Sequence, residues 1–222
     1  MSTEKGDPNL RPGAKGGVRD KNRQEKKRIL RDAAVDLFLS KGIESTTIDD
    51  VTKQAGVAKG SFYRYFEGKE QLVHHLFGPL IAELKEAFAR CSQSLEGTHT
   101  AERMMDVYRD LGAELTHILL QRSHVVKLYL QESRGPHTEA RAPVLEAAQL
   151  ITDQAISLTH LAHKHGLLRP FPPAISALTV VGAAERLLLA VLAEEDIGNP
   201  LEVPENLASL ILEGLLLSKK SH

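Results

Sequence analysis

Apolar residues recur at the spacing of an α-helix along most of this chain. The first clear case lies over residues 23–41, where Ile29, Leu30 and Leu37 fall on one face and charged residues occupy the others. Gly42 follows, at the position where a glycine commonly ends a helix in the left-handed conformation. The pattern therefore predicts an amphipathic helix that ends at Gly42.

A second and a third helix are predicted immediately after it. Thr46 and Thr47 are each followed three residues later by an aspartate, which is the capping-box signature of a helix start. Gly56 provides a turn, and the short helix after it carries Phe62 and Phe66 inward. Two short helices joined by a glycine turn are typical of a helix-turn-helix unit.

Helical spacing continues to the C-terminal end of the chain. We expect a fourth helix from Lys69 to about Phe88 and further helices near residues 100–121, 124–133, 139–165, 173–194 and 204–217. No segment alternates apolar and polar residues as a half-buried strand would. The predicted fold class is all-α.

Composition describes an ordinary soluble protein. Of the 222 residues, 42% are hydrophobic and 26% are charged. Cys91 is the only cysteine, so no intramolecular disulfide can form, which fits a reducing cytoplasm. No segment has the roughly 18 uninterrupted apolar residues of a membrane helix. We expect a cytoplasmic protein with no membrane partner and no signal peptide.

Charge is distributed unevenly, although the formal net charge is only -1. Residues 11–31 contain nine Lys or Arg against two acidic residues, whereas from residue 75 onward 13 basic residues face 18 acidic ones. This asymmetry is expected when only one end of a protein meets phosphate. Residues 1–22 have almost no apolar content and are predicted to be a disordered basic tail, either a solvated leader or an arm that contacts DNA.

The predicted third helix carries side chains suited to DNA. The N-terminal half of such a helix faces base edges in the major groove, where lysine donates to guanine and hydroxyls reach phosphates. The alternative is a three-helix bundle that binds nothing, with its phenylalanines in the core. The predicted DNA-binding residues are Thr46, Thr47, Lys59, Gly60, Ser61, Phe62, Tyr63, Tyr65 and Lys69.

The segment from Ile29 to Leu72 closely resembles the DNA-binding domain of the TetR family of bacterial transcriptional regulators (TetR/AcrR type). The matching marks are Ala33-Ala34, Leu37-Phe38 and Gly42, then Thr47-Ile48 and Ala55-Gly56-Val57, then Gly60-Ser61-Phe62-Tyr63-Arg64-Tyr65-Phe66 and Lys69-Glu70-Gln71-Leu72. Ala58 departs from the family, because a serine or threonine cap is frequent there. Tyr65 stands where a histidine is common.

The resemblance implies a ligand-responsive repressor that binds a palindromic operator as a homodimer and is not an enzyme. It divides the chain into the tail over 1–22, a helix-turn-helix DNA-binding domain over 23–84, and a helical effector-binding and dimerisation domain over 85–222. In such proteins the last two helices form the dimer interface, although the same apolar stripes could be internal core. The expected interface residues are Ile175, Leu178, Gly182, Leu189, Leu207, Leu210, Ile211 and Gly214.

A pocket for an apolar or amphipathic small molecule is expected on the helices between residues 100 and 165. Methionine and aromatic residues at helical spacing are also common in ordinary cores. The pocket candidates are Met104, Tyr108, Leu111, His124, Tyr129 and Gln154.

Two other classes of function, an enzyme and an adaptor, are alternatives to a DNA-binding regulator. A helical metal-dependent hydrolase could use His160, His163 and His165, but no acidic or cysteine ligand completes the set nearby, and the HExxH, GxSxG and phosphate-loop motifs are missing. An adaptor could retain the fold without the DNA site. We expect no metal and no cofactor.

Overall fold

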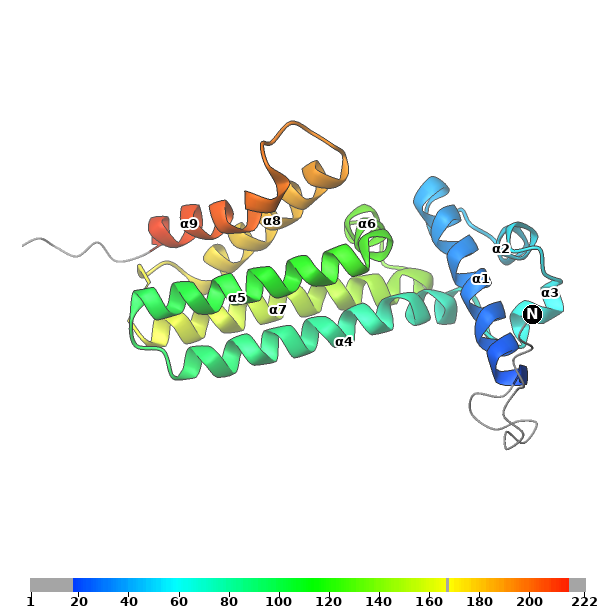
Figure 1. Cartoon of the computed structure of the whole chain (residues 1–222), viewed down its shortest axis with the longest axis horizontal. Helices are drawn as coiled ribbons and strands as arrows, with labels where there is room; N and C mark the ends of the chain where they lie inside the picture. The colour runs from blue at the N-terminus through cyan, green and yellow to red at the C-terminus, as the bar shows by residue number, and fades with distance from the viewer. Residues whose placement is uncertain (1–17, 167, 216–222) are drawn as a thin grey trace, which may run out of the picture. The chain divides into compact units, whose positions relative to one another are not determined.

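The computed structural model describes residues 18–166 and 168–215, and within them the chain is helical without a strand, which confirms the all-α prediction (Figure 1). Two short 3-10 helices, η1 (Glu139–Arg141) and η2 (Pro200–Glu202), accompany the α-helices. The α-helices are α1 (Val18–Lys41), α2 (Ile48–Gln54), α3 (Lys59–Tyr63), α4 (Lys69–Glu96), α5 (Ala101–Gln121), α6 (Ser123–Glu132), α7 (Ala142–Lys164), α8 (Pro173–Leu192) and α9 (Val203–Leu215).

The chain forms two compact units, one ending at Leu72 and the other beginning at Val73. The sequence placed this boundary at residue 84, because the helical pattern of α4 offers no signal for where contacts change partners. Helix α4 begins in the first unit and continues into the second. Each unit is described separately below.

Helix α1 begins at Val18, five residues before the predicted start at Arg23. After Val18 the added residues are polar, so hydrophobic spacing could not reveal them, but lysine and arginine are good helix formers. Further along, Arg28 pairs with Glu25 at 2.6 Å and with Asp32 at 2.8 Å across successive turns. The rest of the predicted tail, residues 1–17, lies outside the described part of the chain.

The N-terminal unit closes around aromatic and aliphatic side chains from all of its helices. Phe38 of α1 and Phe62 of α3 are fully buried, and Phe66 and Val51 are 1% exposed. The Phe62 and Phe66 rings lie 5.6 Å apart between centroids. These contacts fix the short helices, which are too short to be stable alone.

A capping box starts α2, as the sequence predicted. The Asp50 backbone N–H donates to Thr47 Oγ1 at 3.1 Å, and the Thr47 N–H donates to Asp50 Oδ2 at 2.9 Å. Lys41, at the end of α1, pairs with the same Asp50 oxygen at 2.7 Å. The hydrogen bonds from Lys41 and Thr47 hold the pKa of the Asp50 carboxyl well below its usual range.

Lys69, at the start of α4, binds the loop between α1 and α2 through hydrogen bonds. Its Nζ donates to the carbonyl oxygens of Ile43 at 2.7 Å, Glu44 at 3.1 Å and Thr46 at 3.1 Å. An ammonium group has three protons, and here each meets one backbone acceptor. The start of α4 is thereby tied to the loop that precedes α2.

In the C-terminal unit, helices α4, α5 and α7 lie side by side (Figure 1). Ion pairs join neighbouring helices: Arg90 of α4 with Glu114 of α5, Lys85 of α4 with Glu146 of α7 at 3.7 Å, and Arg122 with Glu83 at 2.5 Å. Helix α8 packs along α7, and α9 packs along α5. The layer formed by α8 and α9 covers the α5–α7 layer.

Replacing Lys69 by alanine is expected to destabilise the N-terminal unit by about 1–3 kcal/mol, because three backbone acceptors lose their charged donor. Chemical denaturation of the full chain measures this difference. Lys53→Ala, an exposed change on α2, is the matched control and should leave stability within about 0.5 kcal/mol of the original chain. Equal stability of the two variants would show that the Lys69 contacts contribute nothing.

Asp50→Asn should loosen the start of α2 at neutral pH. Because the folded pKa lies below the unfolded value of about 3.9, the carboxylate stabilises the fold above that pH and loses its effect as pH falls toward the folded pKa. Hydrogen exchange of the α2 amides should therefore differ between the variant and the original chain at neutral pH, and the difference should shrink below pH about 4. Asp36→Asn, on the exposed side of α1, should show no such pH-dependent difference.

Candidate functional site

Helix α3 separates an inward from an outward set of side chains. Phe62 is fully buried, whereas Tyr63 is 51% exposed and Lys59 and Gly60 are exposed as well. Tyr63 rests edge-on against the Phe62 ring with 5.5 Å between centroids, so the buried residue positions the exposed one. Ser61 is half-buried on the same short helix. The outward face is polar and basic, as the major groove requires.

Gly60 presents open backbone on this face. A Cβ built at Gly60 would meet no atom within 4 Å, so glycine is not required by the packing of the described residues. The absent side chain instead leaves room for another molecule to approach the backbone of α3. Gly56, with φ of 66°, makes the turn between α2 and α3 in the left-handed region.

Lys59 is held by an acidic neighbour that sequence reasoning missed. Its Nζ lies 2.7 Å from Asp49 Oδ1, and both side chains are more than half exposed. The hydrogen bond to Asp49 raises the pKa of Lys59. The sequence does show an acidic residue, Asp49, in the first turn of α2. It does not show that the packing of α2 against α3 brings Asp49 and Lys59 together.

Four of the residues predicted to contact DNA make internal contacts in the structure, although Thr47 is also exposed. Thr46 is 1% exposed and its hydroxyl donates to the Gly42 carbonyl at 2.8 Å. The Thr47 hydroxyl donates to Asp50 Oδ2 at 2.7 Å, which completes the cap. Phe62 is core, and the donors of Lys69 are taken by backbone carbonyls. In each case internal hydrogen bonding or burial uses the group that was to meet DNA.

The remaining predicted residues stay together at α3 and just after it. Lys59, Gly60 and Tyr63 are exposed, and Ser61 and Tyr65 are half-buried. Arg64 is also exposed, at the C-terminal end of α3, although the sequence argument used it only as part of a motif. A cation beside two tyrosine hydroxyls can contact phosphate oxygens.

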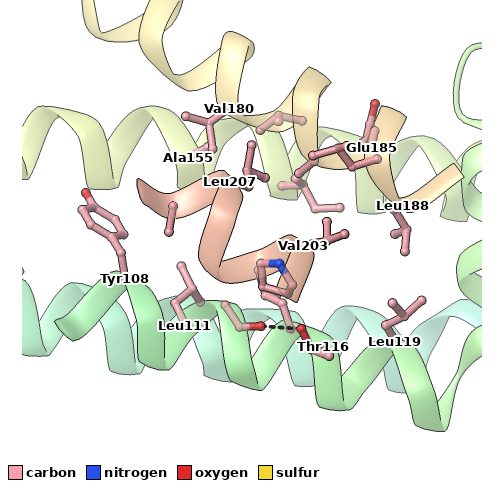
Figure 2. A pocket seen from close by; sticks show the side chains of 18 of the residues that line it. Tyr108, Leu111, Thr116, Leu119, Ala155, Val180, Glu185, Leu188, Val203 and Leu207 are labelled. Atoms are coloured by element: carbon pink, nitrogen blue, oxygen red, sulfur yellow. Dashed lines mark hydrogen bonds between the residues drawn. The ribbon is translucent and has the colours of Figure 1, made fainter. Parts of the chain in front are cut away.

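The C-terminal unit contains an apolar cavity of about 400 Å³ that is partly open to solvent (Figure 2). Tyr108, Leu111 and Tyr129 line it, as predicted. Met104 is fully buried in the core instead, and His124 is exposed and Gln154 half-buried without facing the cavity. The wall contributed by α8 and α9 was not predicted, because the pocket was expected on the helices between residues 100 and 165.

Polar groups are few around the cavity. The Tyr129 hydroxyl donates to Glu185 Oε1 at 2.5 Å, and Arg134 donates to Glu185 Oε2 at 3.0 Å. Burial raises the pKa of Tyr129 and of Tyr108, so both phenols remain protonated donors at neutral pH. The Tyr108 hydroxyl lies 3.4 Å from the Leu158 carbonyl oxygen.

The residues predicted for a dimer interface fall into two groups. Ile175 is 60% exposed, Leu178 54%, Leu189 46% and Leu210 75%, so a large apolar face is open on α8 and α9. Gly182 is half-buried and Gly214 exposed on the same two helices. Leu207 and Ile211 line the apolar cavity instead, because α9 packs along α5.

Helix α8 also has the length and apolar composition that a membrane crossing would need, and is the one described helix that does. Only 17% of that stretch is buried. Two charges lie within it: Glu185, which pairs with Arg134 at 3.0 Å, and Arg186, which pairs with Glu195 at 2.8 Å.

The histidines do not build a metal centre in the described part of the chain. No group of three His, Cys, Asp or Glu side chains there could hold a metal ion. His165 packs edge-on against His99 with 5.3 Å between ring centroids, and His160 is exposed.

Comparison with known proteins supports the assignment from the residues. Residues 30–76 match the model of the bacterial regulatory proteins of the TetR family. An uncharacterised helix-turn-helix transcriptional regulator of Bacillus subtilis, YhgD, is 23% identical over 84% of this chain and 93% of its own length.

Solved structures share the whole fold. NalD, the secondary repressor of the MexAB-OprM multidrug efflux pump in Pseudomonas aeruginosa, superposes with a TM-score of 0.67 at 20% identity, over 88% of this chain and 98% of that one. The regulator FadR from Bacillus subtilis, solved in complex with stearoyl-CoA, gives 0.62 at 17% identity, over 84% and 98%. Residues 30–76 are thus a helix-turn-helix domain of the TetR family of bacterial transcriptional regulators, and the described chain shares the all-α fold of these solved regulators.

Proposed function

We propose that this protein is a ligand-responsive repressor that binds a palindromic operator as a homodimer in the cytoplasm and catalyses no reaction. The observation that carries the proposal is the exposed basic and aromatic face of α3, fixed from behind by buried Phe62. The proposed partners are double-stranded DNA, a second copy of the chain and a small apolar or amphipathic effector.

The DNA contacts are assigned to the part of α3 that packing leaves free. Lys59 donates to a guanine edge or a phosphate, and Ser61 and the Tyr63 hydroxyl contact the backbone or base edges nearby. Tyr65 and Arg64 extend the phosphate-binding face beyond the helix end. The bare backbone at Gly60 permits close approach.

Dimerisation is assigned to the exposed apolar face of α8 and α9. Ile175, Leu178, Leu189 and Leu210 are each between 46% and 75% exposed, which is costly for a protein that remains a monomer in water. A two-fold pairing buries the same patch on both copies. Two DNA-binding units held in this way read two half-sites of a palindrome.

The cavity is assigned to the effector. Its size of about 400 Å³ falls within the usual range of small-molecule sites. The similar protein FadR was solved with stearoyl-CoA, an amphipathic molecule with a long apolar chain, which supports an amphipathic effector here. A ligand that binds one conformation of the dimer better than another shifts its affinity for DNA.

Lys59→Ala combined with Tyr63→Ala should weaken binding to the DNA upstream of the gene by about tenfold or more, since both side chains lie on the outward face of α3. Fluorescence anisotropy against salt concentration measures the affinity, and loss of a phosphate contact should flatten the logarithmic salt dependence by about 0.9. Lys53→Ala on α2 is the charge-matched control. Unchanged affinity in the double variant, with the fold intact, would refute the assignment of α3.

Leu178→Asp with Leu189→Asp should convert the dimer into a monomer, because two charges would be buried at the pairing face. Sedimentation analysis measures the mass in solution. Leu120→Asp is the matched control, since Leu120 is 68% exposed on α5, outside the proposed interface. A monomeric original chain, or a double variant that remains dimeric, would contradict the proposed interface.

A further inference from the structure

The chemistry around the cavity restricts what the cavity can hold. Among the described residues that line it, Glu185 is the only charged one, and none is lysine, arginine or histidine. Figure 2 shows Leu111, Leu119, Val180, Leu188, Val203 and Leu207 surrounding the space. Most of any ligand inside must therefore be apolar.

Ser176 stands out on this apolar wall. It is 5% exposed, it lines the cavity, and its Oγ has no hydrogen-bond partner within the described chain. The two threonine hydroxyls of the described lining make hydrogen bonds within their own helices. Thr116 donates to the Gly112 carbonyl at 2.8 Å and Thr159 to the Ala155 carbonyl at 2.8 Å. A buried hydroxyl without a partner is unfavourable, and a ligand group would relieve it.

Glu185 makes the cavity unfavourable for an anion. Its two carboxylate oxygens already accept from Tyr129 and Arg134, so its charge is balanced without a ligand. Arg134 is 78% exposed and outside the lining, so it offers a buried anion little. A ligand carboxylate would lose its water without gaining a cation.

A ligand cation gains little either, because it would share the single negative charge of Glu185 with the Arg134 guanidinium that already pairs with it. Glu185 lies nine residues after Ser176 on α8, about 13 Å along the helix axis at 1.5 Å per residue. Ser176 and Glu185 therefore mark separate points along an elongated space.

We propose that the cavity binds a neutral, elongated and mainly apolar molecule, whose hydrogen-bonding group meets the Ser176 hydroxyl. This rests on the proposed function, in which the cavity holds the effector. The Ser176 hydroxyl, which lacks a partner, sets where the polar group of the ligand lies. The Glu185 carboxylate, whose charge is already balanced, makes a neutral ligand preferable to a charged one.

A matched series of ligands tests the charge. Decanol, decanoate and decylamine have the same chain and differ at neutral pH only in a neutral, anionic or cationic end. Displacement of the neutral dye Nile red from the full-length protein measures their affinities. Decanol should bind at least about tenfold more tightly than either ion. Tighter or equal binding of decanoate or decylamine, or no binding of decanol, would overturn the proposal.

Two pairs of variants test the residues. Ser176→Ala should weaken decanol about fivefold and leave decane unchanged, whereas Thr159→Val, whose hydroxyl is already satisfied, should change neither. Glu185→Gln should improve decanoate relative to decanol. Equal losses for decanol and decane in Ser176→Ala would point to altered packing and overturn the role of the hydroxyl. Circular dichroism confirms that each variant is folded.

The two proposals fail in different ways. If decanol binds in the cavity but leaves DNA affinity unchanged, the ligand-responsive function is wrong and the ligand class stands. If decanoate or decylamine binds more tightly than decanol and releases DNA, ligand response stands and the neutral class is wrong.

Discussion

Burial of Phe62 and Phe66 is the interaction on which the N-terminal unit of this protein depends. A five-residue helix is too short to persist in water, so α3 exists only while its aromatic side holds it against α1 and α2. Tyr63 leans on Phe62, and Lys59 occupies the first turn of the same helix. The direction of every exposed α3 side chain is therefore set by rings that never meet solvent.

The C-terminal unit leaves apolar surface unburied in two places. Side chains of α8 and α9 line an internal space, and others on the same helices, such as Leu178 and Leu210, are open to solvent. Well-packed interiors rarely keep such space, and exposed apolar patches usually mark a contact with another molecule. Helices α8 and α9 thus border both the proposed ligand and the proposed second subunit. A shift of these helices on ligand binding would therefore also change the dimer interface.

The sequence predicted features that follow from local spacing and missed those that depend on distant partners. The inward period of Phe62 and Phe66 and the Thr47–Asp50 cap are encoded within a few residues, and both are confirmed. The use of Lys69 was not predictable, because its acceptors lie 23 to 26 residues away. Met104, expected in the pocket, lies in the core, and Leu207, expected at the dimer interface, lines the cavity. The reason is the same: an apolar residue on a helical stripe faces core, cavity or partner according to which helix packs against it.

The ion pair between Asp49 and Lys59 gives the DNA-facing surface an internal competitor. Asp49 presents a carboxylate where a nucleic acid would present its own acceptor, so binding exchanges one partner of Lys59 for another instead of capturing a free cation. An exchange of this kind adds little net attraction toward any single phosphate. In the proposed DNA-binding mode, only an acceptor placed well enough to replace the Asp49 carboxylate gains from Lys59, so the ion pair would favour a well-matched DNA site over random DNA.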